Sequence, residues 1–177
     1  EELVELRKNG LGILYYGVET GDDELRKKIT KGSDAKTCIE MGRKVIEAGF
    51  KLSVTVLLGI AGRAGSLKHA QATGELLSAM DPHFIGALTV MLIPGTPLYE
   101  EFVNKKFELP DERELLMELR EMIRHTNLTR GLFYSNHASN YLPVKARLPN
   151  GKQEAIALID RALKGEIGLR PEWMRAL

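Results

Sequence analysis

Hydrophobic and polar positions alternate along this chain in blocks that predict strands and helices in turn. The strongest block runs from Lys51 to Leu58, where apolar and β-branched residues follow one another with little polar interruption. Such a run is typical of a parallel strand that helices cover on both faces. Gly59 and Gly62 come directly after it, and glycine lets a backbone approach a ligand closely. We therefore expect a buried strand that leads into a ligand-binding loop.

Three further stretches predict strands, namely Leu11 to Val18, Phe84 to Ile93 and, more weakly, Gly131 to Ser135. Capping residues and amphipathic spacing predict helices between them. These helices cover 1–9, 22–29, 34–49 (inner residues Ile39, Met41, Val45 and Ile46), 66–80, 98–104, 110–127 and 151–164. We expect the segment 141–148 to be irregular and the tail 171–177 to be anchored, if at all, by Trp173.

The order of these elements is a regular alternation, which predicts an α/β fold with a parallel sheet. In such folds the loops that leave the carboxyl ends of the strands gather on one face and carry the chemistry. Four loops occupy that position here, at 19–20, 59–63, 93–96 and 135–140. Functional side chains are therefore expected along a single edge of the sheet.

Composition and charge limit the partners, the cysteine chemistry and the location that we expect. The 177 residues carry a net charge of +1, which gives no reason to expect a nucleic acid or an anionic membrane as partner. Cys38 is the single cysteine, so no internal disulfide and no thiolate metal site are expected, and within a helix it reads as a small buried hydrophobe. No signal peptide and no run of 18 apolar residues is recognisable, so we expect a cytoplasmic location.

The common nucleotide, hydrolase and zinc-protease motifs are absent, and the candidate chemistry rests on single residues. Arg63 lies in a glycine-rich loop that could hold an anion at a helix start, or could merely turn the chain. Glu19 can accept hydrogen bonds from ribose hydroxyls or an ammonium group, or can cap a helix. His137 is either an acid, base or ligand, or a hydrogen-bonded structural residue. We expect His69, His83 and His125 at the surface.

Three segments together resemble a known superfamily. They are Tyr16 to Gly32 (YGVETGDDELRKKITKG), Val54 to Gly62 (VTVLLGIAG) and Leu92 to Tyr99 (LIPGTPLY). In order and spacing they are similar to the fourth, fifth and sixth strand segments of radical S-adenosylmethionine (radical SAM) enzymes. The branch that they resemble includes coproporphyrinogen-oxidase-like and methylthiotransferase-like proteins. The resemblance covers about residues 1–105, and residues 106–177 form an extension outside the common core.

The resemblance implies a partial (β/α)6 TIM-like barrel whose strand ends bind S-adenosylmethionine. Glu19 and Thr20 would lie at its ribose or methionine side. The cofactor-binding backbone would include Leu58, Gly59, Gly62, Leu92, Ile93 and Pro94. The substrate is unknown, and the residues that we assign to it are Arg63, Asn136, His137 and Asn140.

One departure from the family concerns its iron–sulfur site. The family holds a [4Fe-4S] cluster with three cysteines, Cys-x-x-x-Cys-x-x-Cys, whereas this chain has one. We therefore expect the C-terminal half of a larger enzyme, with no metal ligands of its own and inactive alone. Its sheet should have an exposed edge that invites self-association. Two alternatives stay open. One is a noncatalytic module that binds a nucleotide or anchors a partner. The other is an aldolase-like barrel fragment, which a catalytic lysine at a strand end would favour, and no predicted strand ends in a lysine.

Overall fold

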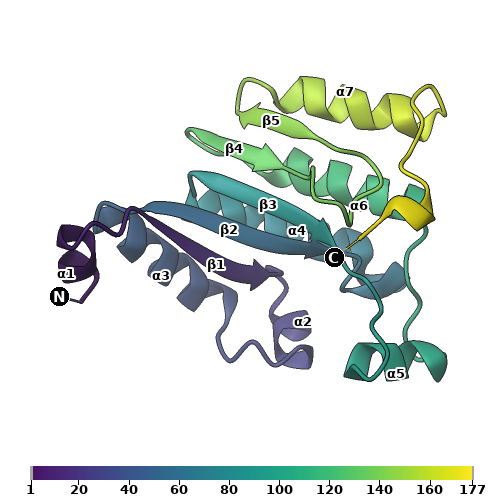
Figure 1. Cartoon of the computed structure of the whole chain (residues 1–177), viewed down its shortest axis with the longest axis horizontal. Helices are drawn as coiled ribbons and strands as arrows, with labels where there is room; N and C mark the ends of the chain where they lie inside the picture. Colours follow the sequence, from purple (N-terminus) through teal and green to yellow (C-terminus); the bar gives the residue numbers. More distant parts are fainter. Residues whose placement is uncertain (1, 177) are drawn as a thin grey trace.

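The structure, a computed structural model, describes residues 2–176 and has an α/β fold. Five strands form one sheet in chain order, and helices alternate with them, as in part of a TIM-like barrel (Figure 1). The strands are β1 (Ile13–Glu19), β2 (Lys51–Leu58), β3 (Phe84–Thr89), β4 (Gly131–Tyr134) and β5 (Lys145–Leu148). The helices are α1 (Glu2–Lys8), α2 (Asp23–Lys28), α3 (Ala35–Glu47), α4 (Gly62–Met80), α5 (Pro97–Val103), α6 (Glu112–His125), α7 (Lys152–Leu163) and the 3-10 turn η1 (Glu172–Met174).

The first four strands are parallel, as predicted, whereas β5 runs antiparallel to β4. The prediction that 141–148 is irregular was therefore wrong for 145–148 and right for 141–144. Val144, Ala146 and Leu148 are buried while Lys145 and Arg147 are exposed, which is the alternation of a half-buried strand. Strands β4 and β5 extend the same sheet beyond residue 105.

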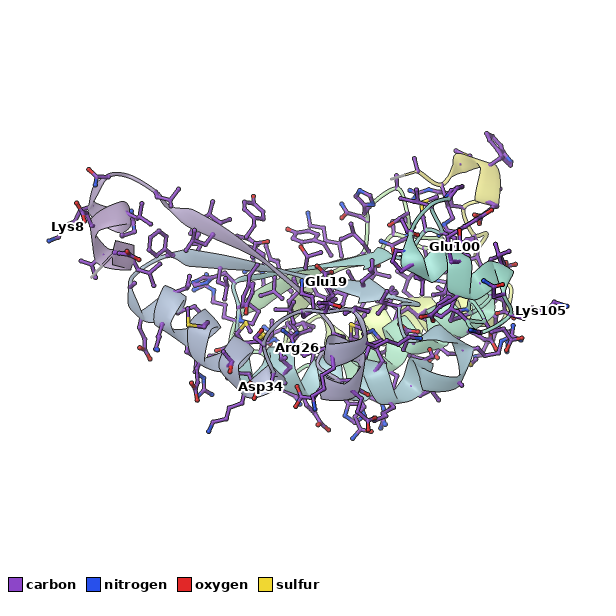
Figure 2. All side chains as sticks on the ribbon, turned by 90° about the horizontal axis from the view of Figure 1, so that it is seen from below. Lys8, Glu19, Arg26, Asp34, Glu100 and Lys105 are labelled. Carbon is purple, nitrogen blue, oxygen red and sulfur yellow. The ribbon has the colours of Figure 1, made fainter. Side chains whose placement is uncertain are left out.

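Helices cover one face of the sheet, which corrects the prediction that β2 is covered on both. Leu52, Val54 and Val56 are buried against the helices, whereas Ser53 and Thr55 are half-buried on the other face. Figure 2 shows the main helices on one side of the sheet and side chains standing free on the other. The second face is therefore an open surface, which we call the open face.

Several element boundaries differ from the predictions. Strand β3 ends at Thr89, not at Ile93, and the chain continues as a loop to Thr96. Thr96 caps α5 and Pro97 is its first residue, as predicted. Helix α4 begins at Gly62, four residues earlier than expected.

Two other predictions about single side chains were wrong. Met41 in α3 is exposed, and Cys38 and Gly42 are the residues of that helix that are fully buried. Trp173 does not anchor the tail, because its side chain is 81% exposed. Arg170 and Arg175 anchor it instead, through hydrogen bonds to carbonyl oxygens of the 137–140 loop.

The two edges of the sheet differ. The β5 edge is short, carries Lys145 and Arg147 and packs against α7. The outer edge of β1 has seven residues, ILYYGVE, and no segment among residues 2–176 pairs with it. Charged residues along the strand are a usual protection of an edge, and β1 carries one only at its end, Glu19.

Candidate functional site

Glu19 ends β1 in an unusual backbone conformation that turns its carboxylate onto the open face. Its φ is 65°, in the left-handed region, and the pairing register with β2 shifts between Gly17 and Glu19. A Cβ atom on Gly17 would lie 2.7 Å from Glu19 Oε1, so the carboxylate folds back over Gly17. Lys31 Nζ lies 3.6 Å from the same oxygen. The carboxylate is one quarter exposed and can accept hydrogen bonds from a ligand.

Arg26, on α2, holds this conformation from the buried side of the sheet (Figure 2). Its Nη1 donates to the carbonyl oxygens of Val18 and Thr20, each at 2.9 Å, so the guanidinium bridges the two residues that flank Glu19. The same side chain donates to Ser33 and to Cys38 Sγ, and it is 2% exposed. A strained φ persists only where the surroundings fix it, and Arg26 supplies that restraint.

Thr20 points away from the open face into the layer between sheet and helices. Its Oγ1 lies 2.7 Å from His69 Nδ1 and accepts the amide hydrogen of Asp22. His69, in α4, is fully buried, so the prediction that it lies at the surface was wrong. Ser66, His69 and Thr73 form a polar stripe on the inner face of α4, and this spacing was the available signal.

Glu118, which the sequence did not single out, lies fully buried on α6 beside this stripe. Its Oε1 accepts the amide hydrogen of Gly59 at 2.7 Å, and its Oε2 accepts a hydrogen bond from the Ser66 hydroxyl. The Gly59 N–H is therefore directed toward α6 and is not free for a ligand. Burial raises the pKa of Glu118 to about 7, and burial lowers the pKa of His69 to about 4.

The loop after β4 is fastened to the end of β3. Asn140 donates to the Ala87 carbonyl and accepts from the Thr89 hydroxyl, and Ser139 Oγ accepts the Thr89 amide hydrogen. Asn140 is buried by these contacts. Asn136 and His137 stay exposed, with His137 Nδ1 3.0 Å from Ser139 Oγ. Asn136 and His137 are therefore the accessible members of this loop.

The remaining predicted residues lie around the β2 and β3 ends. Leu58 is buried on the helix side, and a Cβ on Gly62 would meet Phe107. Arg63 is exposed and pairs with Glu108 and Glu114 across the α4–α6 contact.

The Leu92 to Pro94 backbone stands apart from this packing. Leu92 is half-buried, and Ile93 and Pro94 are exposed. Close by, a cavity of about 280 Å³ opens between Ile60 and the start of α5, and its lining includes Thr30, Thr96 and Leu98. Glu19, this cavity and the loop after β4 all lie at the carboxyl ends of the parallel strands, as the topology predicted.

The described residues do not fit an iron–sulfur cluster. Cys38 is buried between sheet and α3, where Arg26 and Tyr16 donate hydrogen bonds to its sulfur. Within residues 2–176, no three His, Cys, Asp or Glu side chains are grouped as metal ligands. No step that involves a cluster can therefore be built from these residues.

Comparison with known proteins gives one distant relative. No protein-family model matches the chain. Over 115 residues the chain is 24% identical to the heme chaperone HemW of Bacillus subtilis. The aligned region covers 64% of this chain and 30% of that protein. The chain thus spans less than a third of this curated relative's length. The similarity suggests a distant relationship to the radical SAM superfamily.

Proposed function

We propose that this chain is the S-adenosylmethionine-binding half of a radical SAM enzyme whose complete form reductively cleaves that cofactor. The proposed branch is the one that includes coproporphyrinogen-oxidase-like and methylthiotransferase-like proteins, and the chain is inactive alone. The observation that carries the proposal is the carboxylate of Glu19, held in a strained conformation at a strand end. The similarity to HemW supports it. Bound S-adenosylmethionine supplies a sulfonium group whose cleavage starts radical chemistry on a substrate.

The residues of this chain bind and orient the cofactor in this proposal. Glu19 accepts hydrogen bonds from the ribose hydroxyls or from the ammonium group, because an ionised carboxylate is an acceptor only. The segment Leu92 to Pro94 and the cavity beside Ile60 take the adenine, whose flat rings can pack against Ile60 and Leu98. Asn136 and His137 face the substrate.

Replacing Glu19 by glutamine should weaken S-adenosylmethionine binding about tenfold or more at an unchanged melting temperature. A charge-assisted hydrogen bond contributes about 1.5 to 3 kcal/mol, and glutamine removes the charge. Gly17→Ala tests the same site without changing Glu19 itself, because the added Cβ would displace the Glu19 carboxylate and not the backbone. Calorimetry on the full-length protein measures both affinities.

Glu24→Gln is the matched control, since Glu24 lies in the next helix and pairs with Lys68 at the surface. It should leave the affinity as in wild type. Equal affinities for wild type and Glu19→Gln, with a lowered melting temperature for the variant, would reduce Glu19 to a structural residue.

A second function, binding without catalysis, is favoured by one observation: the relative is named a heme chaperone. In this case the open face would hold heme or another planar ligand. Titration of the chain with heme, followed by its absorbance, separates the two. Saturable binding of heme without binding of S-adenosylmethionine favours the second function.

We also propose that the β1 edge pairs with another strand, and that isolated chains self-associate through it. Light scattering should then give a mass above that of a monomer that grows with concentration. Tyr15→Lys should shift the mass toward the monomer, because the exposed Tyr15 ring lies on the edge strand. Leu67→Lys, at an exposed position of α4, is the control and should not. A wild-type monomer at every concentration contradicts this proposal.

Membrane association is not part of the proposal. No helix within residues 2–176 has the length and apolar character needed to cross a membrane. The cytoplasmic location, which we expect because no signal peptide and no long apolar run is recognisable, stays a prediction, and an unknown substrate remains the expected partner.

A further inference from the structure

Polar side chains are buried in a line between the sheet and helices α4 and α6. They join the ends of β1 and β2, the two strands that carry Glu19 and Gly59. From β1 to β2 the order is Thr20, His69, Glu118 and Gly59. The three side chains are fully buried. Burial of four polar groups costs free energy unless each finds a partner, so their arrangement calls for an explanation.

From the contacts along this line we assign the proton of His69 to Nε2. Thr20 Oγ1 accepts the amide hydrogen of Asp22, so its own hydrogen is free to bond to His69 Nδ1, 2.7 Å away. An Nδ1 that accepts leaves the hydrogen of a neutral ring on Nε2. That nitrogen lies 3.5 Å from Glu118 Oε1. Among the buried side-chain nitrogens and oxygens of residues 2–176, this Nε2 lacks a hydrogen bond of good geometry, and the Leu57 backbone of β2 also faces the ring.

The contact between His69 and Glu118 is therefore incomplete in this arrangement. A neutral Glu118 attracts the Nε2 hydrogen weakly, whereas an ionised Glu118 attracts it strongly because the site excludes water. Gly59 feels the same change directly, since its amide donates to the same oxygen. Ionisation of one carboxyl group thus acts on the loops after both strands.

We propose that Glu118 and His69 are positioning residues that couple the strand-end loops of β1 and β2, and that the protonation of Glu118 sets how tightly both loops are held. The coupling itself does not depend on the proposed function. Only its consequence, the pH dependence of ligand binding, rests on that function. Neither residue touches the open face. They act through Thr20, next to Glu19, and through Gly59.

Other charged groups near this line are already paired. On the β1 side, Asp22 faces His69 and pairs with Lys68 of α4 at 2.9 Å. One turn before Glu118 on α6, Glu114 pairs with Arg63. From α4, the group that faces Glu118 besides His69 is the neutral Ser66 hydroxyl. Glu118 is therefore the group that changes charge near neutral pH, in agreement with its pKa of about 7.

Nuclear magnetic resonance of the chain tests the coupling without any ligand. Between pH 5 and 8.5 the amide resonances of Gly59 and Thr20 should shift together, with one midpoint near 7. The Gly59 amide should move downfield as Glu118 ionises. In Glu118→Gln both shifts should vanish. In His69→Gln the Gly59 shift should stay while that of Thr20 is lost.

Two further variants serve as a control and as an independent test of Glu118. Glu121→Gln, three residues along α6 and paired with Arg124 outside this line, should leave both shifts unchanged. Ser66→Ala removes a hydrogen bond that favours the ionised carboxylate, so the midpoint should move to higher pH even if Glu118→Gln does not fold. A Gly59 amide that does not titrate, or a Thr20 shift that persists in Glu118→Gln, would overturn the proposal.

Melting temperatures give a second readout. A carboxyl group whose pKa is higher in the folded chain than in the unfolded chain makes stability fall as pH rises from about 4.5 to 7. His69, whose pKa is lowered, has the opposite effect between about 4 and 6.5. The melting temperature of Glu118→Gln minus that of wild type isolates the Glu118 share and should increase between pH 4.5 and 7. A constant difference would count against the proposal.

Calorimetry with S-adenosylmethionine separates this inference from the proposed function. In the full-length protein, wild-type affinity should change at least threefold between pH 6 and pH 8, beyond any change in Glu118→Gln. Loss of all S-adenosylmethionine binding with the coupled amide shifts intact would reject the proposed function and keep the coupling. The amide shifts could also be coupled while the wild-type affinity depends on pH no more than that of Glu118→Gln. This result would reject the positioning role.

Discussion

Replacement of Arg26 by methionine should lower the free energy of unfolding by about 2 to 6 kcal/mol, because two carbonyl oxygens lose their donor at about 1 to 3 kcal/mol each. Arg26 makes five buried or part-buried hydrogen bonds, three of them to the carbonyl oxygens of Val18, Thr20 and Ser33. Methionine fills much of the same space but donates nothing, so the Thr20 and Ser33 carbonyl groups lose this donor, whereas the Val18 carbonyl still accepts the Thr20 amide hydrogen. Denaturant unfolding followed by circular dichroism measures the loss.

Arg43→Met is the matched control for this prediction. Arg43 lies on α3, is exposed and makes one hydrogen bond, to the Ala79 carbonyl oxygen. Its loss should change the free energy of unfolding by less than about 1 kcal/mol. Arg26→Lys should also destabilise, because an ammonium group cannot span the Val18 and Thr20 carbonyls as the planar guanidinium does. Equal stability of Arg26→Met and Arg43→Met would show that the bridge across Glu19 contributes little.

Replacement of Gly74 by alanine should cost about 2 kcal/mol, although alanine favours helices. Gly74 lies where α4 crosses α6, and a Cβ there would be 2.8 Å from the Met122 carbonyl oxygen and 2.7 Å from His125 Cβ. The Met122 oxygen belongs to the backbone and His125 Cβ is fixed to it, so neither atom can turn aside and the two helices must move apart. Overpacking costs about 1 to 3 kcal/mol, and a clash with backbone lies at the upper end, so about 2 kcal/mol remains after the gain of about 1 kcal/mol in helix propensity.

Gly42→Ala provides the comparison, since Gly42 is also buried within a helix. A Cβ at this position meets the Met80 side chain at 2.5 Å and not a backbone. Because a methionine side chain adapts readily, this variant should lie within about 1 kcal/mol of wild type. If Gly74→Ala proved as stable as Gly42→Ala in thermal melts, the close approach of α4 and α6 would not limit stability.

The fold was predictable where local signals were strong. The capping residues Asp34 and Thr96 and the apolar run of β2 placed their elements within a few residues. The start of α4 was missed because Ala61 offers no capping side chain. The Arg63 amide donates instead to the Glu108 carbonyl, a contact between distant segments. Strand β3 was predicted too long because 90–93 is apolar, whereas its neighbour β2 ends at Leu58, which pairs with Thr89.

The candidate site was predictable in position but not in its support. Parallel topology alone places Glu19 and the loops after β2, β3 and β4 at one edge. Arg26, His69 and Glu118, which hold these loops, were not identified as functional residues, because helix periodicity does not say which polar residue of a charged helix turns inward. The signal for α4 was present in the stripe of Ser66, His69 and Thr73, which shares its face with Ala70 and Leu77. Nothing in the local sequence marks Glu118.

The exposed tryptophan has a spectroscopic consequence. Trp173 is the single tryptophan of the chain, and it is 81% exposed although Arg170 and Arg175 pin the tail that carries it. Its fluorescence in the folded chain should already resemble that of a solvated indole and change little on unfolding. The emission is therefore a poor monitor of folding. It is instead a natural reporter for any ligand or protein that covers the tail beside the strand ends, which would shift the emission to shorter wavelength.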